Sequence, residues 1–79
     1  MKAEIYSRNN CVFCDKAKIR LSKYNPIVRM LDQDYTRKDF FKKFPNAKTF
    51  PQIIINGEHV GGYYELKKWI DQNLLDEDF

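Results

Sequence analysis

The stretch NNCVFCDKAK, residues 9–18, holds both cysteines of the chain, at positions 11 and 14. It follows AEIYS, residues 3–7, whose β-favouring residues predict a strand that ends at the polar cluster before the cysteines. From Val12 to about Tyr24 we predict a helix, because apolar residues recur at steps of four and three: Phe13, Ala17, Leu21 and Tyr24. Asn25-Pro26 ends this helix, since the residue before a proline avoids helical geometry. The cysteines are therefore expected in a strand-to-helix turn.

The remainder of the chain alternates strands and helices. PIVRML, residues 26–31, reads as a second strand, and Thr36 with Asp39 has the form of a capping box that opens a short helix. In FPQIIINGEHV, residues 50–60, an Asn-Gly pair between β-branched runs predicts a hairpin. After Gly61-Gly62 a final helix is indicated by a mostly apolar stripe, namely Leu66, Trp69, Ile70, Asn73 and Leu74.

The predicted order is β-α-β-α-β-β-α, which favours an α/β fold. A parallel strand pair joined by a right-handed crossover would be flanked by the hairpin, and helices would cover both faces of a four-stranded mixed sheet. At 79 residues, with 43% hydrophobic and 32% charged residues, the chain is expected to form one domain over residues 1–79.

Composition also narrows the class of partner and the compartment. No apolar run reaches the roughly 18 residues that cross a bilayer, and the first ten residues lack a secretory signal, so we expect a cytosolic protein without a membrane partner. The net charge of +3 is spread too thinly for a nucleic-acid face, although a mild positive field would favour small anionic partners.

The cysteine spacing points to redox chemistry. Cys11 sits where the unpaired N–H groups and the positive end of a helix would stabilise a thiolate, the form that attacks disulfides. Cys14, one turn later, would reach a sulfur bonded to Cys11 and expel the partner. Two other interpretations remain: a zinc site, for which His59 is the one available histidine, and two buried inert cysteines.

IYSRNNCVFC, followed by TFPQIIINGEHVGGYYEL, resembles the glutaredoxins over nearly the whole chain. Three elements carry the resemblance: the CxxC that opens a helix, the segment from Thr49 to Ile53, and Gly61-Gly62 before the last helix. It implies a thioredoxin-like fold and a monomeric thiol–disulfide oxidoreductase that uses glutathione and no metal. It also implies that Cys11 attacks, that Cys14 resolves, and that protein disulfides such as that of ribonucleotide reductase are the substrates.

The resemblance further implies a glutathione site and a cis Pro51. The backbone of Phe50 would pair with the peptide of glutathione, and the helix start after Gly62 would receive its γ-glutamyl carboxylate. The expected glutathione-binding residues are Arg8, Phe13, Lys38, Thr49, Phe50, Pro51, Gly62, Tyr63, Tyr64 and Glu65.

Several positions depart from the usual glutaredoxin pattern. Val12 and Phe13 replace the Pro-Tyr between the cysteines, and Tyr64 replaces a residue that is commonly Asp or Ser. Two alternatives of function follow. One is a neighbouring redoxin family that is reduced by thioredoxin reductase and serves ribonucleotide reductase, since its members share an Arg-Asn stretch and a valine after the first cysteine. The other is a glutathione-ligated [2Fe–2S] cluster module.

Overall fold

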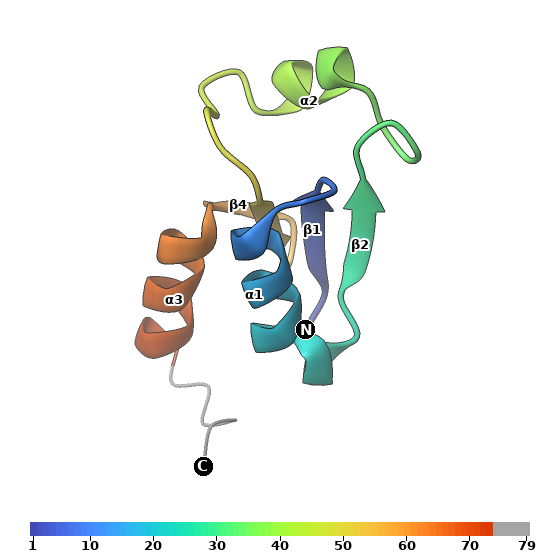
Figure 1. Cartoon of the computed structure of the whole chain (residues 1–79). Coiled ribbons are helices and arrows are strands. Elements are labelled where there is room, and N and C mark those ends of the chain that lie inside the picture. Colours follow the sequence, from blue (N-terminus) through green and yellow to red (C-terminus); the bar gives the residue numbers. More distant parts are fainter. Residues whose placement is uncertain (74–79) are drawn as a thin grey trace.

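Four strands form one mixed sheet in the order β2-β1-β3-β4 in the computed structural model, which describes residues 1–73. Figure 1 shows α1 and α3 side by side on one face of this sheet, and α2 beyond the end at which β1 and β2 finish. The elements are β1 Ala3–Ser7, α1 Val12–Arg20, the 3₁₀ helix η1 Ser22–Tyr24, β2 Ile27–Met30, α2 Arg37–Lys43, β3 Gln52–Ile55, β4 Glu58–Gly61 and α3 Tyr63–Gln72.

The sheet joins a parallel pair to a hairpin. β1 runs parallel to β2, with Ile5 opposite Val28, and antiparallel to β3, with Ile5 opposite Ile53. β4 returns antiparallel to β3 through the Asn56-Gly57 turn, where both residues have positive φ, as a tight hairpin turn requires. The predicted element order and hairpin are confirmed.

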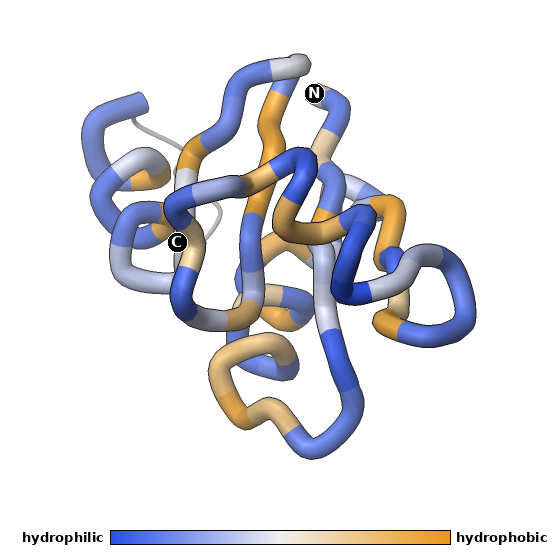
Figure 2. Tube along the Cα trace, turned by 90° about the horizontal axis from the view of Figure 1, so that it is seen from above, coloured by the Kyte–Doolittle hydropathy of each residue, from blue (hydrophilic) through white to orange (hydrophobic). Residues whose placement is uncertain are grey.

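The larger core lies between the sheet and the pair α1 and α3. Strand side chains alternate between the two faces, so alternate residues of β1 and β3 point toward these helices. The cluster consists of Ala3, Ile5, Ala17, Leu21, Ile53, Ile55, Leu66 and Ile70, each at most 3% exposed. All four residues of β3 are buried, and Figure 2 shows hydrophobic stretches of this kind alternating with hydrophilic ones along the chain.

A smaller aromatic core lies on the opposite face of the sheet, at the end beyond which α2 lies, so the predicted helical cover of this face is only partial. Its buried members are Tyr6, Tyr35, Phe40, Phe44 and Ile54. Phe40 lies in α2 and Phe44 is the C-cap of that helix. The predicted capping box sets the start of α2: Asp39 N–H donates to Thr36 Oγ1 at 3.1 Å, and Thr36 N–H donates to Asp39 Oδ2 at 3.2 Å.

The first helix is shorter than predicted. α1 ends at Arg20, and the chain tightens into η1, where Tyr24 N–H donates to Leu21 O at 2.9 Å. Ser22 Oγ donates to Ile19 O at 2.9 Å and so satisfies a terminal carbonyl of the helix. Asn25 then takes a left-handed conformation with φ of 49° ahead of Pro26. An apolar period of three or four cannot distinguish α from 3₁₀ geometry over one turn.

The predicted inward face of this helix was also partly wrong. Cys14, Ala17 and Leu21 are fully buried, whereas Phe13 is 39% exposed and points away from the core. Leu74, predicted on the stripe of the last helix, lies outside the described residues. Residues 1–73 contain no helix of the length and apolarity needed to cross a bilayer.

Tyr35 ties the loop before α2 to the end of β1. Its hydroxyl donates to Ser7 O at 2.6 Å and its ring packs edge-on against Tyr6. Burial raises the pKa of Tyr35 to about 12, with Tyr6 and Asp32 adding to the shift. The folded protein therefore favours the neutral form of the Tyr35 phenol.

Phe40 should carry much of the stability of the aromatic core. We expect Phe40→Ala to lower the free energy of unfolding by about 3–5 kcal/mol, because the side chain is 2% exposed and its loss leaves a cavity. Phe41→Ala is the matched control: that neighbour is 46% exposed, and its replacement should cost less than about 1 kcal/mol. Urea unfolding measures both, and equal losses would contradict this account of α2.

Tyr35 should make stability fall at alkaline pH. The unfolded phenol loses its proton near the ordinary pKa of 10.0, but the folded one only near 12, so the folded state binds more protons between these values. The stabilisation is complete below pH 10 and is lost as the pH rises toward 12, amounting to about 2 kcal/mol. In Tyr35→Phe this component should vanish. Unfolding measured from pH 8 to 11.5 in both proteins tests it, and parallel curves would refute it.

Candidate active site

The two cysteines lie at the junction of β1 and α1 and are joined by a disulfide. Cys11 is the N-cap of α1 and is 8% exposed, whereas Cys14 is 0% exposed. Cys14 N–H donates to Cys11 Sγ at 3.2 Å, and the N–H groups of a first helical turn have no partner inside the helix. The outer sulfur therefore has a donor and a helix start that would stabilise a thiolate.

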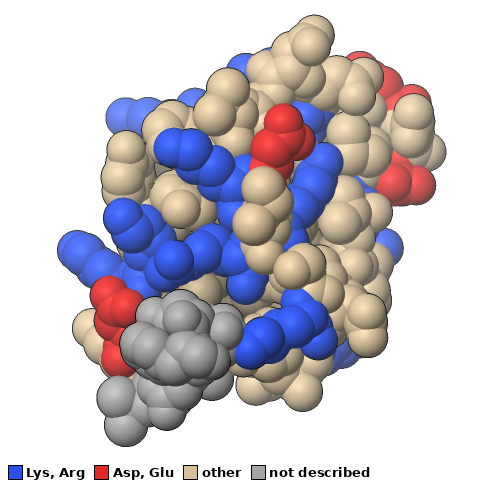
Figure 3. Space-filling view, turned by 60° about the horizontal axis from the view of Figure 1, so that its bottom comes forward, with Lys and Arg blue, Asp and Glu red and all other residues tan. Residues whose placement is uncertain are grey.

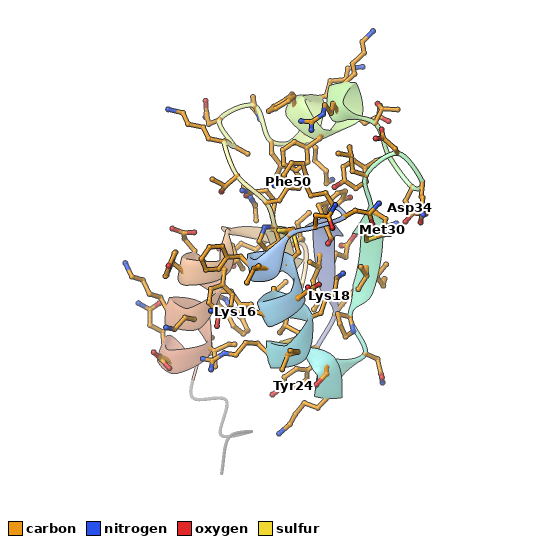
Figure 4. All side chains as sticks on the ribbon, in the orientation of Figure 1. Lys16, Lys18, Tyr24, Met30, Asp34 and Phe50 are labelled. Carbon is orange, nitrogen blue, oxygen red and sulfur yellow. A yellow bond between two sulfur atoms is a disulfide. The ribbon has the colours of Figure 1, made fainter. Side chains whose placement is uncertain are left out.

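The segment before β3 lies against this sulfur. Cys11 Sγ is 3.8 Å from Phe50 O, and the Phe50–Pro51 peptide bond is cis, as the resemblance implies. The Phe50 ring stacks on Phe40 at 4.4 Å, and the Arg8 guanidinium lies 5.7 Å from the centre of the Phe50 ring. Figure 4 shows Phe50 between α2 and the start of α1. The aromatic core thus holds the backbone beside Cys11.

The buried side chain of Gln52 supports the backbone of Thr49. Gln52 is 5% exposed; its Nε2 donates to Thr49 O at 2.9 Å, and its Oε1 lies 2.8 Å from His59 Nε2. The His59 ring also packs on Phe44 at 4.6 Å. His59 therefore has partners in the fold, and residues 1–73 contain no group of three or more metal-ligating side chains. Sequence reasoning missed Gln52, whose polarity inside an apolar strand was the available signal.

A cavity of about 540 Å³ opens beside Cys11. Of the predicted site residues it is lined by Arg8, Cys11, Phe13, Thr49 and Phe50, together with Asn10 and Val12. Two further basic residues, Arg37 and Lys48, line it but were missed by the sequence analysis.

The structure puts Arg37, at the first position of α2, on the cavity wall where Lys38 was expected; Lys38 lines neither this cavity nor its neighbour. Successive residues on a helix point about 100° apart, so adjacent positions face different surroundings. The cavity is cationic on this side.

A second cavity, of about 230 Å³, continues from the first to the start of α3. It shares Phe13, Thr49 and Phe50 with the larger cavity and adds Gly62, Tyr63, Tyr64 and Glu65. Gly62 N–H donates to Glu65 Oε1 at 2.8 Å, so this donor is already satisfied. The next N–H groups of α3 begin the helix and have no intrahelical acceptor. Pro51, the remaining predicted site residue, is fully buried and lines neither cavity.

Three aromatic rings form the outer wall of the second cavity. Phe13 lies 5.7 Å from Tyr63 and 5.6 Å from Tyr64, measured between ring centres. Lys16 Nζ lies 5.4 Å from the centre of the Phe13 ring, and Lys67 Nζ lies 6.0 Å from that of Tyr63. Phe13 therefore lies outside the core and packs in this aromatic wall.

Basic side chains also gather on the face shown in Figure 3, with few acidic ones among them. Of the ion pairs among the described residues, Lys18 meets Asp15 at 3.7 Å, and Arg29 meets Glu4 at 3.0 Å. The full chain carries 14 Lys and Arg against 11 Asp and Glu, a net charge of +3, which gives the molecule a mild excess of positive charge.

Comparison with known proteins agrees with this geometry. The glutaredoxin family model matches residues 3–60. Glutaredoxin 1 of Rickettsia prowazekii is 38% identical over 92% of this chain and 81% of its own length. The structure of glutaredoxin 1 from Francisella tularensis superimposes with a TM-score of 0.76 at 33% identity, covering 92% of this chain and 95% of that one.

Reduced Escherichia coli glutaredoxin gives a TM-score of 0.76 at 28% identity, covering 94% of this chain and 98% of that one. The predicted thioredoxin-like fold is confirmed. With its two cysteines at the start of α1, the chain belongs to the glutaredoxin family of thiol–disulfide oxidoreductases.

Proposed function

We propose that this protein reduces protein disulfides and glutathione mixed disulfides with electrons from glutathione. The observation that carries the proposal is the pair of adjoining cavities, of which the larger is lined by Cys11. Glutathione has a carboxylate at each end and a thiol between them. One cavity offers guanidinium and ammonium groups from Arg8, Arg37 and Lys48, and the other offers the start of α3.

Backbone pairing supplies the central contact in this proposal. The segment Thr49 to Phe50 is common to both cavities, and Phe50 O faces Cys11. An extended peptide whose cysteine reaches Cys11 can therefore add to the Phe50 backbone as a short antiparallel strand. Pro51 has no N–H to compete for the added chain, and Phe13 with Tyr63 and Tyr64 would exclude water from one side.

The reaction follows from the unequal burial of the cysteines. The Cys11 thiolate attacks a substrate disulfide, forms a mixed disulfide with one sulfur and releases the other as a thiolate that takes up a proton. Cys14 then attacks Cys11 Sγ, which expels the remaining substrate thiol and leaves the Cys11–Cys14 disulfide. One glutathione thiolate opens that disulfide at Cys11, and a second removes the first as oxidised glutathione. Two electrons pass from two glutathiones to one substrate disulfide.

The proposal also covers the partners of the protein, its oligomeric state and its cellular compartment. Disulfide-bearing proteins such as ribonucleotide reductase fit a reaction in which Cys14 resolves a mixed disulfide. A dithiol carrier works under reducing conditions, which fits the cytosol. We propose that the protein acts there as a monomer. Reduction by thioredoxin reductase in place of glutathione is the competing outcome of the test that follows.

Turnover should depend on glutathione and on the two cysteines unequally. We expect the purified protein to turn over a small glutathione mixed disulfide with NADPH, glutathione and glutathione reductase, and to show little turnover with thioredoxin reductase alone. Cys14→Ser should keep this activity and lose most reduction of protein disulfides, because one attacking thiolate suffices for the mixed disulfide. Cys11→Ser should lose both.

Oxidation of NADPH, followed by its absorbance, measures each rate. Turnover with thioredoxin reductase only would overturn the glutathione proposal and favour the neighbouring redoxin family. Equal losses in the two serine variants would overturn the assignment of attacking and resolving cysteines.

Arg37 should contribute to glutathione affinity and Lys38 should not. Arg37→Ser removes a cation from the cavity beside Cys11, so we expect KM for glutathione to rise about two- to fivefold, the range of an exposed ion pair, with little change in kcat. Lys38→Ser is the matched control, since it removes the same charge one residue away. A rise in KM for Lys38→Ser alone would restore the sequence-based assignment of that lysine.

A further inference from the structure

Ser7 is a buried hydroxyl that the reaction described above does not use. It ends β1 and is 0% exposed, and its Oγ has no hydrogen-bond partner among residues 1–73. Its carbonyl is well satisfied, accepting from Leu31 N–H at 2.9 Å and from Tyr35 Oη at 2.6 Å. A buried hydroxyl that gives up water without gaining a partner costs free energy, so its presence calls for a physical explanation.

The sheet and helix registers place Ser7 and Cys14 on the sides of β1 and α1 that pack together. Side chains of β1 alternate, so Ser7 shares a face with Ala3 and Ile5, which pack in the core with Ala17 and Leu21 of α1. Cys14 precedes Ala17 by three positions and shares its buried side of the helix.

The chain reverses direction between β1 and α1 (Figure 1), so the end of the strand faces the first turn of the helix. In that turn Cys14 is the buried residue, and it is bonded to Cys11.

Reduction changes what the Cys14 sulfur needs. In the disulfide this sulfur carries no charge and no proton. After two electrons and two protons enter and the S–S bond breaks, Cys14 is a thiol, and it must become a thiolate in order to attack a mixed disulfide on Cys11. Apolar burial disfavours a thiolate, whereas a hydroxyl donor stabilises it.

We propose that Ser7 Oγ donates a hydrogen bond to Cys14 Sγ once the disulfide is reduced, so that Ser7 is a positioning residue for the resolving cysteine. In the oxidised protein the hydroxyl has no partner among the described residues 1–73, and in the reduced protein it gains Cys14 Sγ. This coupling favours the dithiol form and the attack by Cys14. It depends on exchange between Cys11 and Cys14 and is independent of which reductant serves the protein.

The test compares disulfide equilibria in a dithiothreitol buffer, which needs neither glutathione nor a reductase. Ser7→Thr and Ser7→Val form the matched pair, since they have the same shape and differ in the hydroxyl. We expect Ser7→Val and Ser7→Ala to shift the equilibrium toward the disulfide about three- to tenfold, where tenfold equals about 30 mV. Ser7→Thr should stay near the native value.

Ser22→Ala serves as a surface control, because the Ser22 hydroxyl is exposed and donates to Ile19 O. Thiolate absorbance in the reduced protein should show the second thiol ionising at higher pH in Ser7→Val than in Ser7→Thr. Protein-disulfide reduction should slow more than glutathione mixed-disulfide turnover, since the latter needs Cys11 alone.

Urea unfolding of the oxidised protein separates this role from a structural one. Loss of an unpartnered hydroxyl should leave the oxidised form equally or more stable in Ser7→Ala, while the reduced form is destabilised. An identical equilibrium for the Thr and Val variants would overturn the proposal, as would equal destabilisation of both redox forms. Failure of glutathione to reduce the native protein would overturn the proposed function but leave this inference standing.

Discussion

The central position of β1 is the constraint on which the rest of the structure depends. β1 pairs on one side with β2 and on the other with β3, and its end leads directly into Cys11. Because β3 is antiparallel to β1, the start of β3 lies at that same end, and the Thr49–Pro51 segment is brought there. β4 is antiparallel to β3, so Gly62 and the start of α3 return to the same end. The order and direction of the strands thus bring three segments that are distant in sequence to the Cys11 sulfur.

The packing of α1 on the sheet gives the two cysteines different environments. α1 lies on the sheet through Ala17 and Leu21, which turns Cys14 inward and leaves Cys11 at the helix end, where a donor and a cavity are available. The attacking position is open to a substrate, and the resolving position is screened from water. Such screening protects the second sulfur and also makes its thiolate costly. Ser7 lies on the face of β1 that packs against α1, and in our proposal its hydroxyl stabilises the Cys14 thiolate.

The aromatic core links this chemistry to α2. Phe40 stacks on Phe50, so α2 also fixes the backbone beside Cys11. The same helix brings Arg37 to the cavity wall. Gln52 supports Thr49 from the same face, because its partner His59 packs on Phe44 of the aromatic core. The backbone of Thr49 and Phe50 is therefore held by side chains on the aromatic-core face of the sheet.

Local chemistry along the chain was enough to identify most of the fold. Propensity and turn residues predicted β1, the Thr36 capping box and the Asn56-Gly57 hairpin, because each depends on neighbours within a few positions. The CxxC spacing at the start of a helix, together with the Thr49 segment and the glycine pair, was enough to indicate the family.

Tertiary structure decided the properties that depend on where side chains point. It ended α1 at Arg20, turned Phe13 outward, and chose Arg37 over Lys38 for the cavity. It also satisfied Gly62 N–H with Glu65 and gave the Ser7 hydroxyl no hydrogen-bond partner within the described part of the chain. These outcomes depend on packing between segments far apart in the sequence, where a rotation of one residue along a helix changes which surface a side chain meets.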